Sequence, residues 1–139
     1  MNPLEIVVAP DAKAEIRAVQ VWLHTLDPSS ERRFSQRLAN LLEKLAKTLP
    51  SKIATGRPPQ LDTKASEGMI RPVFQERFYT SKQKPPRRSN TSTWRIFYAL
   101  LDQDGDRQPE VLQVLHIFHA AAELPWDRLE SLGVETDND

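Results

Sequence analysis

The chain has 139 residues, in which 19 Lys and Arg balance 19 Asp and Glu, and it has no cysteine. This length suits one domain with its own core, and the lack of cysteine excludes disulfides and thiolate metal sites. The sequence contains no apolar run long enough to cross a membrane and no secretory signal at its N-terminus. We therefore expect a cytoplasmic protein.

The first half of the chain predicts one strand followed by two helices. Residues 4–9 are short and β-branched, which is typical of a strand. Pro10 and Asp11 suit the first turn of a helix, whose apolar residues then recur at helical spacing. Asp27 is a candidate N-cap for a second, longer amphipathic helix, which we expect to end at Pro50. Two helices joined by so short a turn form an antiparallel hairpin.

The second half predicts three strands and a short closing helix. Residues 51–66 are rich in turn formers and indicate a loop, and residues 81–92 are polar and indicate a hairpin loop. We expect strands at residues 69–80, 93–102 and 110–118, and a short helix after Pro125.

These elements predict an α+β fold with the order β-α-α-β-β-β. A helical hairpin would cover one face of a small sheet, and the last three strands are close enough in sequence to form an antiparallel meander. We expect a single domain over residues 1–133, followed by a disordered acidic tail at residues 134–139.

Charge is distributed unevenly along the chain. Residues 77–101 contain six Lys and Arg and no acid, whereas residues 102–139 contain two basic residues against ten acids. The basic block is where a polyanion would bind. The alternative is a solvated loop, because Lys and Arg are mostly surface residues.

Two histidines close the last predicted strand. His116 and His119 are three residues apart, so a regular strand places them on opposite faces of the sheet. Two histidines with no third ligand form a poor zinc site, and we expect no metal and no other cofactor.

Four segments together resemble the RelE/ParE superfamily of bacterial toxins from type II toxin–antitoxin systems. They are IVVAPDAKAEIRAVQVWL near the N-terminus, GRPPQLD after the second helix, TWRIFY in the penultimate strand and VLQVLHIFHA in the last strand. The likeness extends from about residue 4 to residue 126, and LHIFH followed by a proline is similar to the HigB-like branch.

The resemblance implies one of two activities. RelE-like and HigB-like members enter the ribosomal A site and cleave mRNA there, which requires no metal. ParE-like members inhibit DNA gyrase and hydrolyse nothing. In both cases a cognate antitoxin protein neutralises the toxin. A third hypothesis is an inactive relative that only binds an antitoxin.

On this resemblance, Arg95 and His119 are the catalytic residues. Arginine keeps its charge and can bind two phosphate oxygens at once, and histidine side chains titrate near neutral pH. A structural ion pair is the alternative role for Arg95, and a surface position at a strand end is the alternative for His119. The RNA backbone would contact Arg71, Arg77, Lys82, Lys84, Arg87 and Arg88. We interpret His116 as structural and Tyr98 as a core residue.

Overall fold

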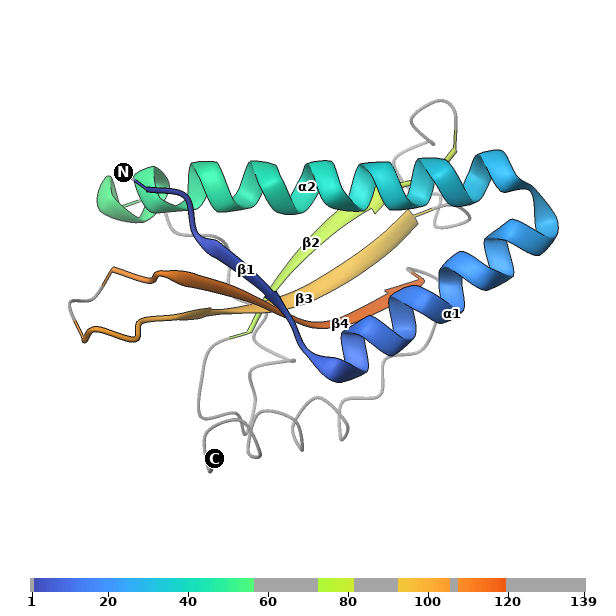
Figure 1. Cartoon of the computed structure of the whole chain (residues 1–139). Coiled ribbons are helices and arrows are strands. Elements are labelled where there is room, and N and C mark those ends of the chain that lie inside the picture. Colours follow the sequence, from blue (N-terminus) through green and yellow to red (C-terminus); the bar gives the residue numbers. More distant parts are fainter. Residues whose placement is uncertain (1, 57–72, 82–92, 106–107, 120–139) are drawn as a thin grey trace.

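The computed structural model describes residues 2–56, 73–81, 93–105 and 108–119 (Figure 1). Its elements follow the predicted order β-α-α-β-β-β, and the α+β class is confirmed. The elements are β1 (Glu5–Val8), α1 (Pro10–Leu26), α2 (Pro28–Ala54), β2 (Phe74–Tyr79), β3 (Thr93–Leu101) and β4 (Val111–His119).

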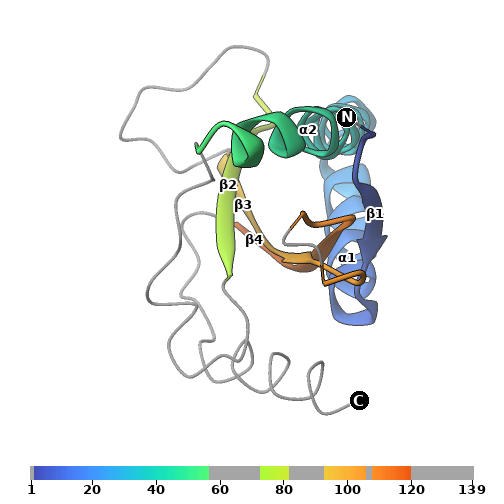
Figure 2. The same cartoon turned by 90° about the vertical axis from the view of Figure 1, so that its left-hand side faces the viewer.

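The four strands form one mixed sheet in the order β1-β4-β3-β2. Strands β2, β3 and β4 form the expected antiparallel meander, whereas β1 adds to the far edge by pairing in parallel with β4. The sheet is curved, with β1 and β2 on either side and α2 over the space between them (Figure 2). Neither described helix combines the length and apolar composition needed to cross a membrane.

Asp27 is the whole connection between the two helices. Its amide donates to the carbonyl of Leu23, which closes α1, and its Oδ1 accepts from the amide of Ser29 at 3.0 Å, which begins α2. The N-cap predicted at Asp27 is therefore confirmed. One residue thus ends one helix and starts the next.

The Asp27 cap makes stability depend on pH. The Ser29 amide, followed by the Ser30 hydroxyl, holds the pKa of Asp27 below its ordinary value. A lowered acid pKa stabilises the fold above the unfolded pKa of about 3.9, and this stability is lost as the pH falls through the folded pKa. We expect Asp27→Asn, which keeps a capping oxygen, to flatten the acid limb of thermal unfolding midpoints measured from neutral to acidic pH. An unchanged acid limb would contradict this assignment.

Helix α2 does not end at Pro50, which corrects the sequence prediction. It continues to Ala54, and Pro50 is buried inside it. Proline has no N–H to donate to the carbonyl four residues earlier, which here is that of Ala46. The Leu4 amide donates to that carbonyl instead, at 2.9 Å. The Ala46 carbonyl, which has no helical donor because residue 50 is proline, thus holds Leu4, the residue before β1. The extra helical turn lets Ile53 pack on the core.

Pro50→Ala tests this exchange of partners. The new N–H would compete with the Leu4 amide for the Ala46 carbonyl. We expect the Leu4 amide to exchange with solvent roughly 2- to 10-fold faster, which corresponds to the net energy of one hydrogen bond. Pro28→Ala is the matched control, because the first turn of a helix needs no such donor. Equal exchange of the Leu4 amide in all three proteins would show that Pro50 has no such role.

The main core lies between the helices and the sheet. Phe34 of α2 is fully buried and contacts Phe78 of β2, with ring centroids 5.6 Å apart, and Trp94 of β3, at 5.2 Å. A second buried cluster lies on the other face of the sheet. Its residues are Val73, Phe97, Ala99 and Leu115, with Leu101 and Phe118 packed against them.

The strand bounds agree with the sequence predictions to within one residue where both ends are described. The turn after β3 is held by Asp102, whose Oδ1 accepts from the amide of Gly105 at 2.9 Å. Gly105 has a φ of 72°, which glycine adopts without strain. The predicted closing helix, the acidic tail, and most of the 51–66 and 81–92 loops lie outside the described residues.

Candidate nucleic-acid interface

A register shift in β4 determines which side chains share a face. Phe97 pairs with His116, but the next residue, Tyr98, pairs with Val114. Leu115 is therefore an extra residue in β4, as in a β-bulge. Because of this shift, Val114 and Ile117 both belong to the core on the helix side despite their odd spacing.

Arg77 and Arg95 are direct cross-strand partners. They pair between β2 and β3, and their neighbours Phe78 and Trp94 belong to the core on the helix side. Alternation along the strands places both arginines on the opposite face. Arg77 is exposed and Arg95 is half-buried. Directly opposed residues have β-carbons about 5 Å apart, so two guanidinium groups can reach one phosphate.

His119 does not share that face. It pairs with Trp94, and its ring contacts the Trp94 ring edge-on, with centroids 4.9 Å apart and an interplanar angle of 90°. Trp94 faces the helices, whereas Arg95 faces away from them. The paired strands thus do not bring the two predicted catalytic residues together on one face.

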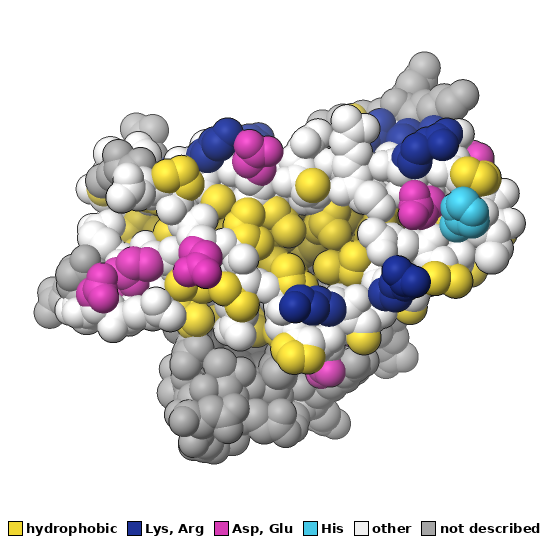
Figure 3. Space-filling view, viewed as in Figure 1, with side chains coloured by type: hydrophobic (Ala, Val, Ile, Leu, Met, Phe, Trp, Pro, Cys, Tyr) yellow, Lys and Arg dark blue, Asp and Glu magenta, His cyan; other side chains and the backbone are white. Residues whose placement is uncertain are grey.

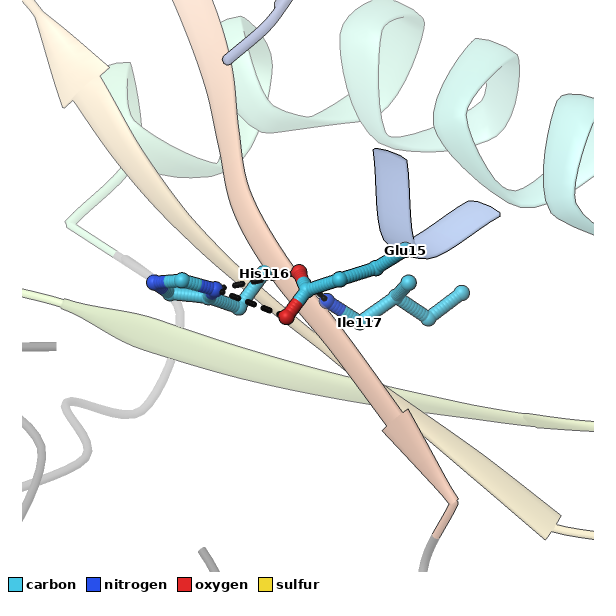
Figure 4. A network of polar contacts seen from close by, with 3 residues as sticks. All are labelled: Glu15, His116 and Ile117. Atoms are coloured by element: carbon cyan, nitrogen blue, oxygen red, sulfur yellow. Dashed lines mark hydrogen bonds and ion pairs between the residues drawn. The ribbon is translucent and has the colours of Figure 1, made fainter. Parts of the chain in front are cut away.

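His116 is buried, and it binds a residue that sequence reasoning missed. Its Nδ1 lies 3.0 Å from Oε1 of Glu15, a residue of α1 (Figure 4). The same carboxylate oxygen accepts from the amide of Ile117 at 3.3 Å. An ionised carboxylate only accepts, so Nδ1 carries the proton in this pair. His116 Nε2 is buried and has no hydrogen-bond partner among the described residues.

The position of Glu15 follows from the length of β1. Strand β1 pairs with β4 only as far as Val114, so the edge of β4 beyond that residue has no neighbouring strand among those described. Helix α1 packs there, and the Glu15 carboxylate takes the place of a strand carbonyl for the Ile117 amide. The sequence signal that could have identified Glu15 is the presence of a carboxylate between the apolar positions Ala12 and Ile16.

Two arginines of α2 hold the chain where the basic 82–92 segment begins. Arg33 Nε donates to the carbonyl of Thr80 at 2.9 Å. Arg37 donates to the carbonyls of Tyr79, at 2.8 Å, and Ser81, and its guanidinium lies 4.6 Å from the centre of the Tyr79 ring. The Tyr79 ring thus contacts Arg37.

Tyr98 is a core residue, in agreement with its interpretation from sequence. Its side chain is fully buried, and burial, with a smaller contribution from the charge of Glu76, raises the pKa of its phenol well above the ordinary value. Tyr98 therefore stays protonated at physiological pH and is a poor candidate for proton transfer.

The remaining predicted RNA contacts lie outside the described residues: Arg71, Lys82, Lys84, Arg87 and Arg88. Within the described part of the chain, no three His, Cys, Asp or Glu side chains gather as a metal site would require. Comparisons with protein-family models, curated proteins and solved structures found no match to this chain.

Proposed function

We propose that this chain is the toxin component of a type II toxin–antitoxin system and inhibits translation by cleaving mRNA on the ribosome. The proposal combines the RelE/ParE-like sequence segments with the α+β order of elements. The observation that carries it is the cross-strand pair Arg77 and Arg95, which places two cations side by side on one sheet face.

The arginine pair suits the electrostatic part of RNA cleavage. Attack by a 2′-hydroxyl places additional charge on the phosphate, and a guanidinium that binds two of its oxygens stabilises that charge. Arg95 is half-buried and held in a central strand, so it supplies a fixed cation, while the exposed Arg77 contributes the second. We assign both residues to the phosphate that is cleaved.

Neither histidine of β4 is placed to transfer a proton at the arginine pair. His119 faces the helices, and His116, the other histidine of β4, is buried and bound to Glu15. We therefore expect His119→Ala to reduce cleavage far less than Arg95→Ala.

A protein partner is part of this proposal. Apolar side chains gather in a hollow between α2 and β1 (Figure 3), and large apolar residues of α1 are exposed. Val21 is 55% exposed, Trp22 52% and Leu26 64%, and all three lie in the C-terminal half of α1. An exposed apolar surface of this kind marks a protein contact. We assign it to a cognate antitoxin in the cytoplasm.

The test is a primer-extension map of a reporter mRNA in a cell-free bacterial translation reaction with the purified protein. New 5′ ends that require ribosomes would support the proposal. An uncut message would overturn the nuclease activity and direct the work to gyrase supercoiling assays, and then to antitoxin binding alone.

Inhibition of DNA gyrase is the second candidate function. The separation of Arg95 and His119 on opposite faces favours it, because a protein-binding toxin needs no catalytic pair. This activity predicts DNA damage and filamentation with intact mRNA, and indifference to the loss of His119.

A further inference from the structure

A row of three residues crosses the sheet on the face away from the helices. Arg77 of β2 lies opposite Arg95 of β3, and Arg95 lies opposite Phe118 of β4. Neighbouring strands are about 4.8 Å apart, so this row extends over about 10 Å. Two cations and one aromatic ring thus lie at successive positions across three neighbouring strands.

The ring of Phe118 packs against two neighbouring rings. It stacks on His116, with centroids 5.4 Å apart and an interplanar angle of 18°, and it contacts Phe97 edge-on at 5.9 Å. His116 is fully buried and is itself oriented by Glu15. Phe118 remains only half-buried, so part of its surface is accessible. The sheet therefore presents a fixed, partly open aromatic surface beside two arginines.

We propose that the row of Arg77, Arg95 and Phe118 binds one nucleotide of a single-stranded RNA. The phosphate lies on the two arginines, and the base stacks on Phe118. This inference rests on the proposed function and adds the class of ligand, because only an unpaired base can stack on a protein ring. Stacking tolerates any base, so the row selects single strands rather than a sequence. Glu15 and His116 are positioning residues for the ring.

Binding of two probes of equal charge tests this assignment. One is an RNA pentamer, and the other is a ribose-phosphate pentamer without bases, each measured by fluorescence anisotropy. We expect Phe118→Leu to weaken binding of the RNA pentamer roughly 5- to 100-fold, and to leave the base-free pentamer unchanged. Phe118→Tyr should bind both probes as the native protein does. Arg95→Ala should weaken binding of both.

Phe74→Leu is the matched control, because it removes a ring that contacts Tyr98 in the helix-side layer of the sheet. It should leave both affinities unchanged. If Phe118→Leu does not fold, Phe118→Met replaces it. In either case, the native protein should bind the RNA pentamer roughly 5- to 100-fold more tightly than the base-free pentamer.

The outcomes separate the two proposals. Equal affinities of the native protein for both probes, or equal weakening of both by Phe118→Leu, would overturn the stacking role. If Arg95→Ala still weakened binding of both probes in that case, the phosphate site of the proposed function would be supported without the stacking role of Phe118. If Arg95→Ala weakened neither, the phosphate site itself would be wrong.

Discussion

Arg95→Ala is expected to reduce ribosome-dependent mRNA cleavage by about 100-fold or more and to abolish toxicity in cells. Removal of one preorganised group that stabilises transition-state charge costs about that much in enzymes of acyl and phosphoryl transfer. Arg95 is half-buried in a central strand of the sheet, so it supplies the fixed cation of the pair, whereas Arg77 is exposed. The cleavage rate from primer extension with purified ribosomes measures the effect.

Two further variants define what the Arg95 result means. Arg95→Lys keeps the charge but loses the planar, two-pronged donor, so we expect it to recover only part of the activity. Arg17→Ala removes an equal charge from an exposed position on α1 and should cleave like the native protein. Comparable losses in Arg17→Ala and Arg95→Ala would indicate a general charge effect on ribosome binding, which contradicts a specific phosphate site.

Local chemistry made much of the fold predictable. The strands, both helices and their order follow from apolar periodicity and from turn residues, and Asp27 was identified as a cap from its place beside Pro28. The opposite faces of His116 and His119 also followed from spacing, because both residues come after the bulge at Leu115. In each case, residues within a few positions of one another determine the outcome.

Contacts between distant segments were not predictable in the same way. Nothing near β1 in the sequence specifies a parallel pairing with β4, since the partners of Glu5–Val8 are Val111–Val114, at the other end of the described chain. The end of α2 was misplaced for a similar reason, because the donor that uses the Ala46 carbonyl is Leu4, far away in sequence. The catalytic roles of Arg95 and His119 were inferred from the resemblance, which does not specify the sheet face on which each side chain lies.

The bond between Glu15 and β4 explains why a charged side chain lies on the inner side of α1. Its carboxylate accepts from His116 Nδ1 and from the Ile117 amide, two donors that α1 covers. The Glu15 side chain is only 14% exposed and that of His116 is 0% exposed, so water cannot readily replace the carboxylate. This one side chain therefore joins the first helix to the unpaired edge of the last strand, 101 residues away.

Glu15→Ala is accordingly expected to lower the free energy of unfolding by about 2–6 kcal/mol, because each of the two buried donors left unsatisfied costs about 1–3 kcal/mol. Glu15→Gln keeps one acceptor oxygen and should lose about half as much. Urea unfolding followed by circular dichroism measures both values. The double variant Glu15→Leu with His116→Phe removes both polar partners and should be more stable than Glu15→Ala alone, because it leaves fewer donors unpaired. A loss below about 0.5 kcal/mol for Glu15→Ala, within the range of ordinary surface substitutions, would show that the helix is held on the strand edge by apolar packing alone.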